Sequence, residues 1–173
     1  MRTNTNQNSA ISDIEYSGFR PGAISTLCAI QSEFYAREWG FNHLYESVVA
    51  TSVGEFLTRF DQQRDFIELV LYQGRVAGGI AIDHRDGSVA QLRWFILTDE
   101  LRGAGAGKKL INDAMQFVKQ QGFKQVYLTT FEGLDGARSL YEKHGFRLTE
   151  QQLAATWGKE VNEQRFDWYS SYF

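Results

Sequence analysis

A glycine-rich segment in the middle of the chain constrains the fold more than any other feature. It reads Arg102-Gly103-Ala104-Gly105-Ala106-Gly107-Lys108-Lys109, follows strand-forming residues at 89–97, and precedes a helical pattern of apolar residues that ends at Gly122. The N–H groups and dipole at the start of a helix favour an anion, and small residues let phosphate oxygens approach the backbone. Arg102, Lys108 and Lys109 can add charge-assisted contacts. We therefore expect an anion-binding loop; the alternative is a tight turn whose glycines only permit close packing.

Two common nucleotide-binding loops do not fit this segment. A P-loop needs Ser or Thr after Gly-Lys, whereas Lys109 follows Gly107-Lys108, and it needs a glycine where Arg102 stands. The dinucleotide fingerprint needs a third glycine, and Lys108 or Leu110 would occupy that place. Neither ATP nor NAD is therefore the expected ligand.

The rest of the chain alternates between strand and helix periodicity. We expect strands at 13–19, 66–72, 76–83, 89–97, 124–130, 146–148 and 165–173, and helices from Pro21 to Gly40, over 45–60, from the glycine-rich segment to Gly122, and over 134–144. Three consecutive strands form an antiparallel meander, and the strand–helix–strand unit after them requires one parallel crossover. The predicted fold is mixed α/β (α+β): a mostly antiparallel central sheet with flanking helices. Gly78 and Gly79 indicate a bulge or a close backbone approach in the middle strand.

Length and composition restrict the remaining possibilities. The 173 residues fit a single domain, for which we take 11–173, behind a flexible polar tail at 1–10. The formal net charge of −3 gives no reason to expect nucleic acid, and no apolar run is long enough to span a membrane. The single cysteine, Cys28, excludes an internal disulfide, suits a reducing cytoplasm and is expected in the core.

Three motifs resemble one enzyme family. Arg102, Gly105 and Gly107 fit the pattern Arg/Gln-x-x-Gly-x-Gly/Ala, which resembles the pyrophosphate loop of the GNAT superfamily of acyl-CoA N-acyltransferases. The acidic turn 98–101 before the loop is usual in that family, and residues 137–146 are similar to its Ala-x-x-Leu-Tyr-x-x-x-Gly-Phe signature. With the matching element order, the resemblance extends from Ile14 onward.

A finer resemblance is to GNAT domains fused behind a MarR-type winged-helix regulator. It is based on Leu92-Arg93-Trp94-Phe95, Thr130-Phe131-Glu132-Gly133-Leu134 and Trp157-Gly158. Leu134 stands where some members have an asparagine, so that cofactor contact is not carried over. The tail before Ile11 is too short for a winged helix, and we expect no DNA binding by that route.

The GNAT resemblance implies acetyl-CoA as cofactor and assigns site residues; no metal is expected. The pyrophosphate would lie on the loop, and the pantetheine arm would pair with the backbone of a strand that splays from its neighbour. The cofactor-binding residues are then Phe95, Ile96, Leu97, Arg102, Gly103, Ala104, Gly105, Ala106, Gly107 and Lys108. Tyr141 matches the general acid that protonates the leaving thiolate, and a backbone N–H near Ile96 or Leu97 would be the oxyanion donor. The alternative for Tyr141 is that it only packs its helix against the sheet.

The general base and the acceptor stay open. Gln91 occupies the position of the glutamate base of histone-acetylating members, and an amide cannot accept the proton. Asp83, His84, Glu38 or a chain of waters are the candidates. The first two helices bring aromatic residues together with glutamates, an aromatic-acidic wall that suits a cationic amine with an apolar body; the alternative is ordinary core. These residues are Tyr35, Trp39, Phe41, His43 and Tyr45 with Glu33, Glu38 and Glu46.

We therefore predict a cytoplasmic N-acetyltransferase that moves an acetyl group from acetyl-CoA to a primary amine of a small molecule. Two alternatives remain: a non-catalytic acyl-CoA-binding or sensor module of the same fold, and an acetyltransferase of protein N-termini. A homodimer is left open.

Overall fold

The computed structural model describes residues 13–172, and it has the predicted order of elements. The strands are β1 (Ile14–Ser17), β2 (Phe66–Tyr72), β3 (Arg75–Asp86), β4 (Val89–Leu97), β5 (Gln125–Phe131), β6 (Arg147–Ala154) and β7 (Val161–Tyr169). The helices are α2 (Ala23–Trp39), α3 (His43–Thr58), α4 (Ala106–Gln121) and α5 (Asp135–Lys143), with short 3₁₀ turns η1 (Asp99–Leu101) and η2 (Ser170–Tyr172). The flexible tail expected at 1–10 lies outside the described residues.

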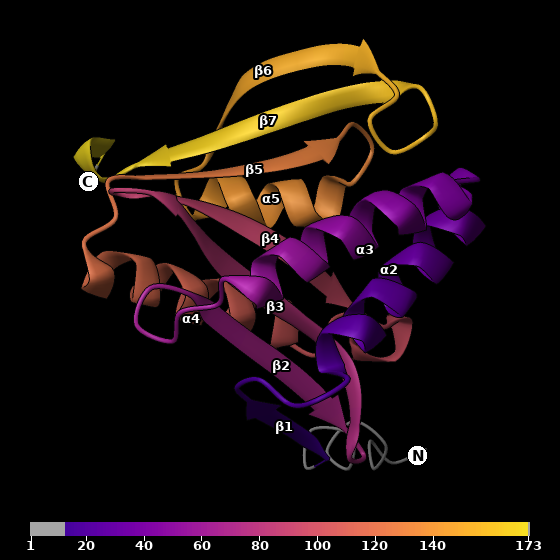
Figure 1. Cartoon of the computed structure of the whole chain (residues 1–173), viewed down its shortest axis with the longest axis horizontal. Coiled ribbons are helices and arrows are strands. Elements are labelled where there is room, and N and C mark those ends of the chain that lie inside the picture. Colours follow the sequence, from indigo (N-terminus) through magenta and orange to yellow (C-terminus); the bar gives the residue numbers. More distant parts are fainter. Residues whose placement is uncertain (1–12, 173) are drawn as a thin grey trace, which may run out of the picture.

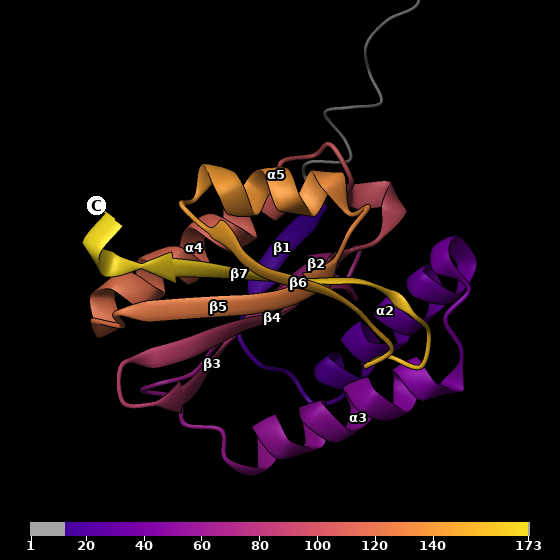
Figure 2. The same ribbon diagram turned by 90° about the horizontal axis from the view of Figure 1, so that it is seen from above.

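The strands form one seven-stranded sheet in the order β1-β2-β3-β4-β5-β7-β6. Every neighbouring pair is antiparallel except β4 and β5, which are parallel and are joined through α4. The predicted mixed sheet with one parallel crossover is thereby confirmed (Figure 1). Helices α2 and α3 cover one face, and α4 and α5 cover the other (Figure 2). Each helix layer closes its own apolar core, and Cys28 is buried in the core under α2 and α3, as expected.

The most informative differences from the predicted boundaries are in α2, β6 and β7. The first helix begins at Ala23, because Pro21 lies in the turn before it and Gly22 is the N-cap. β6 extends to Ala154 although most of it is polar and exposed, because it pairs as an edge strand with β7 along its length. β7 accordingly starts at Val161, before the predicted 165, and it ends at Tyr169. Pairing with a neighbour has overridden local propensity here.

Bulges interrupt the pairing of the central strands. Val70 faces Gly78 and Leu71 faces Val76, so β3 has an extra residue opposite β2, as the glycine pair predicted. A β-carbon on Gly78 would lie 2.5 Å from the carbonyl oxygen of Ile96, which explains the need for glycine.

In the part of the chain that the structure describes, none of the helices has the length and apolarity needed to cross a membrane.

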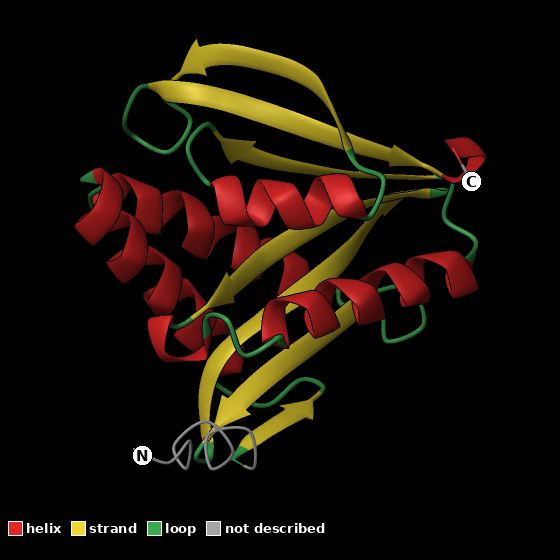
Figure 3. Ribbon diagram, turned by 180° about the vertical axis from the view of Figure 1, so that it is seen from behind, coloured by secondary structure: helices red, strands yellow, loops and turns green. Residues whose placement is uncertain are grey.

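The back view shows α4 and α5 lying across the sheet beside the strands that diverge (Figure 3).

Candidate active site

The site begins where two neighbouring strands part. β4 and β5 are paired only from Val89 with Gln125 to Gln91 with Tyr127, although both strands continue beyond that point. Past this pair the two ribbons diverge (Figure 1). β4 also carries a bulge, because two residues, Trp94 and Phe95, oppose the single residue Ile80 of β3. A bulge bends its strand, and here it lies in the half of β4 that has left β5.

The backbone of β4 beyond the bulge presents free groups to the parted side. The N–H of Thr98 donates to the carbonyl oxygen of Ala77 on β3, at 2.8 Å. The close approach of Ile96 O to Gly78 shows that Ile96 faces β3 as well. Because backbone groups alternate in direction along a strand, those of Phe95 and Leu97 point away from β3. Of the two expected oxyanion donors, the geometry therefore favours the N–H of Leu97 over that of Ile96.

A groove lies along this end of β4 and passes the start of α4 and α5. Eight of the ten predicted cofactor-binding residues line it: Phe95, Ile96, Leu97, Arg102, Gly103, Gly105, Gly107 and Lys108. The other two do not, because the Ala106 side chain is buried in the core and Ala104 is exposed outside the groove. The predicted residues are thus brought together, with the loop at one end and the strand edge beside it.

The start of α4 has the features of an anion site. The first intrahelical hydrogen bond is donated by Lys109 N to Gly105 O, at 3.1 Å, so the N–H groups of Ala106, Gly107 and Lys108 precede the ladder. Gly103 and Gly105 have φ of +80° and +82°, a left-handed conformation that branched residues avoid. A β-carbon at Gly107 would lie 3.3 Å from Leu97 Cδ1, a contact tight enough that the leucine side chain would have to shift. The N–H groups and the dipole together fit a pyrophosphate.

Two of the three basic residues of the loop border the groove. Arg102 pairs with Asp99 at 3.0 Å and lies over the ring of Phe34, 4.6 Å from its centroid, so it connects the loop with α2. Lys108 also lines the groove. Lys109 does not: its ammonium pairs with Asp113 and with Glu68. The expected anion contact from Lys109 is therefore wrong.

A cavity of about 270 Å³ adjoins the groove between the parted strands. Its walls come from α2, α3, β4, β5, α5 and the loop between β6 and β7. Tyr35, Phe95, Leu134 and Ala137 line both the cavity and the groove, so the two spaces meet. A molecule in the groove and a second one in the cavity can therefore touch.

Tyr141 lies on the cavity wall at this junction. Its side chain is buried, and its ring is 6.0 Å from that of Phe95. Burial, and secondarily Tyr35, raises the pKa of the Tyr141 hydroxyl above its ordinary value. The group is therefore protonated at neutral pH and lies where it can donate a proton.

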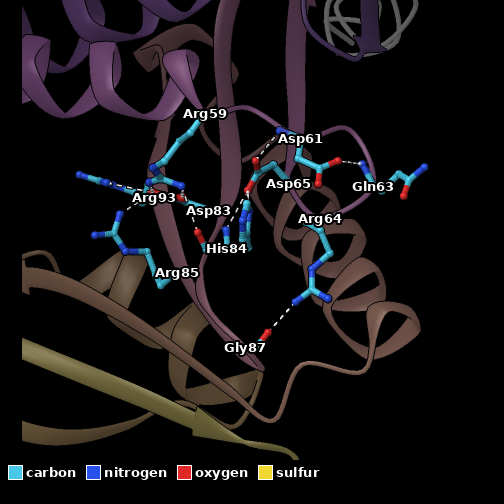
Figure 4. Close-up of polar contacts among 10 residues, drawn as sticks. All are labelled: Arg59, Asp61, Gln63, Arg64, Asp65, Asp83, His84, Arg85, Gly87 and Arg93. Atoms are coloured by element: carbon cyan, nitrogen blue, oxygen red, sulfur yellow. Dashed lines mark hydrogen bonds and ion pairs between the residues drawn. The ribbon is translucent and has the colours of Figure 1, made fainter.

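None of the three candidate bases lines the cavity. Asp83 is fully buried beneath Arg59, Arg85 and Arg93 (Figure 4). Burial alone would raise the pKa of Asp83, but the hydrogen bonds and charges of Arg59 and Arg93 outweigh it and lower that pKa. An ion-paired carboxylate with a lowered pKa is a poor proton acceptor, so Asp83 is wrong as a base.

The other two candidates lie elsewhere. His84 Nδ1 is 2.7 Å from Oδ1 of buried Asp65, in the network of Figure 4. Glu38 is half-exposed, pairs with Arg37 at 2.7 Å and borders a hollow that adjoins the groove at Arg102 and Leu134, outside the cavity. Gln91 does line the cavity, and its Oε1 accepts a hydrogen bond from Tyr127.

Of the predicted aromatic-acidic wall, the structure places some of the aromatic residues at the cavity and none of the acidic ones. Tyr35 and Tyr45 line the cavity with Phe131 and Trp157, whereas Phe41 is buried in the core under α2 and α3. Glu33, Glu38, Glu46 and His43 do not line it. Among the described residues around the cavity, the single charged one is Arg93. The acidic part of the prediction is therefore wrong.

Sequence reasoning missed several wall residues. Arg93, Thr129, Thr156 and Gln31 line the cavity but received no role. Arg93 had a signal, because it is a lone charge in an otherwise apolar end of a strand. Thr156 and Trp157 come from the β6–β7 loop. The position of this loop depends on the pairing of β6 with β7, which the polar sequence of β6 does not predict.

Comparisons with known proteins agree on one family. The family model described as "Acetyltransferase (GNAT) family" matches residues 25–146. An Escherichia coli (strain K12) protein, described as the uncharacterized N-acetyltransferase YjgM, is 32% identical over 113 residues, 64% of this chain and 68% of that protein. Human N-acetyltransferase 8B is 31% identical over 87 residues, 49% of this chain and only 38% of its own length.

Solved structures share the fold at low sequence identity. A GNAT-family acetyltransferase of Staphylococcus aureus Mu50 superposes with a TM-score of 0.71 at 17% identity, covering 90% of this chain and 98% of that one. The structure of yncA from Salmonella typhimurium, solved with its cofactor acetyl-CoA, gives a TM-score of 0.68 at 11% identity and covers 91% and 94% of the two chains.

Proposed function

Because this chain belongs to the acetyltransferase (GNAT) family, we propose that it transfers the acetyl group of acetyl-CoA to a primary amine of a small molecule. The observation that carries the proposal is the junction of two spaces between β4 and β5. A groove that ends at an anion-binding helix start meets a cavity that is lined by Tyr141. This is the arrangement that a two-substrate transfer reaction requires.

The groove residues fit acetyl-CoA. The N–H groups at the start of α4, with Arg102 and Lys108 beside them, would hold the pyrophosphate, and the free backbone of Phe95 and Leu97 would pair with the amides of the pantetheine arm. When bound, acetyl-CoA supplies a thioester that an amine can attack. The acetyl-CoA held by yncA supports this choice by analogy of fold.

The chain's own groups would then assist at two points. The Leu97 N–H is placed to donate to a carbonyl oxygen that gains negative charge. The Tyr141 hydroxyl donates a proton to the departing sulfur. No carboxylate or histidine lines the cavity among residues 13–172, and we therefore assign the removal of the amine's proton to water.

An acetylation assay with a panel of small amines, reading the release of free CoA thiol, tests the proposal. A thermal-shift measurement runs beside it, because a ligand at a hundredfold excess over its Kd stabilises the folded state by about 2.7 kcal/mol. We expect acetyl-CoA to raise the Tm and ATP or NAD to leave it unchanged. Acetyl-CoA binding with no turnover across the panel favours the sensor, and stabilisation by NAD without any by acetyl-CoA refutes both.

Three further expectations stay predictions: a cytoplasmic location, a homodimer as the assembly left open, and a closer relation to GNAT domains fused to MarR-type regulators.

A further inference from the structure

Arg93 gives the acceptor cavity a positive charge that the proposed reaction does not use. Its side chain is only 17% exposed, and its guanidinium lies over the ring of Trp94, 4.6 Å from the centroid. Nη1 of Arg93 lies 3.1 Å from Oδ2 of Asp83. Within residues 13–172, no hydrogen bond from its Nε or Nη2 to a protein acceptor is found, so part of the guanidinium is available to a ligand.

Arg93 shares its carboxylate partner with two other arginines. Arg59, Arg85 and Arg93 converge on Asp83 (Figure 4); Asp65 and Glu55 also act on Arg59, whereas Asp83 is the one carboxylate that acts on Arg93 within the described residues. Asp83 holds the Arg93 guanidinium in place from behind. A buried cation is costly unless it is paired, and an anion in the cavity would complete the pairing.

The structure therefore points to an acceptor class, and the inference rests on the proposed function. We propose that the acceptor is a free amino acid, an amine that also carries a carboxylate, and that Arg93 binds this carboxylate. A guanidinium presents parallel N–H groups that match the two oxygens of a carboxylate. Arg93 and Phe95 line the same cavity of about 270 Å³, so one small molecule can reach both the guanidinium and the strand end where transfer would occur.

The remaining walls favour an apolar body on that acceptor. A continuous aromatic surface is formed by Tyr35, Tyr45, Phe131 and Trp157. The distance between ring centroids is 5.2 Å for Tyr35 and Tyr45 and 5.9 Å for Phe131 and Trp157. A polyamine, by contrast, would bring further positive charge to a cavity that offers no carboxylate.

Matched pairs of amines test this inference: phenylalanine against phenethylamine, tyrosine against tyramine, and leucine against isopentylamine. The members of each pair differ in the carboxylate and, because of it, in the pKa of the amine, so kcat/KM is compared per neutral amine. We measure kcat/KM by thiol release and, by calorimetry, binding of each amine to the CoA-loaded protein. We expect the amino acid of at least one pair to be preferred by roughly tenfold to a hundredfold, as for a hydrogen-bonded charge contact.

Two arginine variants separate recognition from structure. Arg85 and Arg93 each lie 3.1 Å from Oδ2 of Asp83, but only Arg93 lines the cavity. Arg93→Gln should raise the KM for the amino acids by roughly tenfold to a hundredfold more than it raises the KM for the decarboxylated amines. Arg85→Gln should change neither. Arg93→Lys should restore part of the preference, because it keeps the charge and loses the planar fork.

The outcomes distinguish the inference from the function beneath it. Turnover or binding that shows no preference for the amino acids, or a preference that survives in Arg93→Gln, overturns the acceptor class and leaves the acetyltransferase intact. A protein that neither binds acetyl-CoA nor releases thiol with any amine overturns the proposed function instead.

Discussion

Gln91 and Tyr127 are the last paired residues of β4 and β5, and their side chains are joined by a hydrogen bond of 3.2 Å from the Tyr127 hydroxyl to Gln91 Oε1. The strands part directly after this pair, and the cavity opens there. Gln91 therefore lies where the resemblance places a base, while its amide serves to hold the two strands together.

Replacing Gln91 tests whether it has a chemical role. Gln91→Ala should lower kcat by less than about fivefold, because it removes one hydrogen bond and no proton acceptor. Gln91→Glu should move the acidic limb of the rate–pH profile to lower pH, since it adds a base to the cavity. A hundredfold loss in Gln91→Ala would give the amide a direct part in catalysis.

Tyr141→Phe removes one hydroxyl and keeps the ring that packs on Phe95. We expect kcat to fall by about 10²–10⁴-fold, with a much smaller change in the KM for acetyl-CoA. Tyr16→Phe is the control, because Tyr16 lies on β1 beside Lys109, outside the cavity and the groove. An enzyme indifferent to Tyr141→Phe keeps the proposed function and loses its assigned acid.

The wild-type rate–pH profile should reflect the acceptor and not a cavity base. kcat/KM should rise through the pKa of whichever amine is used, because only the neutral amine attacks and no carboxylate or histidine of residues 13–172 lines the cavity. Tyr141 acts when protonated, and burial raises its pKa, so activity should persist above pH ~10, the ordinary phenol value. An inflection near pH 6–7 that stays fixed when the amine is changed would indicate a base that this site lacks.

Gly107→Val should abolish the Tm increase caused by acetyl-CoA while leaving the far-ultraviolet circular dichroism unchanged. The added side chain would press on Leu97, Leu140 and Phe95, on the wall of the groove. Gly54→Ala is the matched control in another helix, where a β-carbon meets nothing within 4 Å. Normal acetyl-CoA binding by Gly107→Val would place the cofactor elsewhere.

Asp83→Asn should lower the free energy of unfolding by about 3–5 kcal/mol, because it leaves three arginines around a neutral group. The exposed Asp99, which pairs with Arg37 and Arg102, is the control, and Asp99→Asn should cost at most ~1 kcal/mol. Urea titrations measure both. Since the folded-state pKa of Asp83 is lowered, its contribution is complete above pH ~4 and is lost as the pH falls below that.

The elements and the loop could be predicted because their signals are local. Helix and strand periods repeat within a few residues, and the anion site lies within one turn of a helix. The acceptor cavity could not be predicted, because a single bulge in β4 determines which side chains form its wall. Arg93, the residue before the bulge, pairs with Ala81 on the α2–α3 side of the sheet, and Trp94, the first residue of the bulge, faces that same side. An unbroken strand would have alternated these two side chains.

The fate of the candidate bases shows the same limit. Asp83 meets Arg59 and Arg93 from 24 and 10 residues away, so nothing local reveals that its charge is already paired. The polar stretch of β6 becomes a strand only because β7 lies beside it, and this pairing carries Thr156 and Trp157 to the cavity.

The helix α3 lines one of the two spaces of the site and not the other. α3 contributes Tyr45, Val48, Val49 and Ser52 to the cavity and, within the described chain, no residue to the groove. Substitutions on this one helix can therefore change the shape and polarity of the cavity, and with them the kind of molecule that fits it, while the groove keeps its lining.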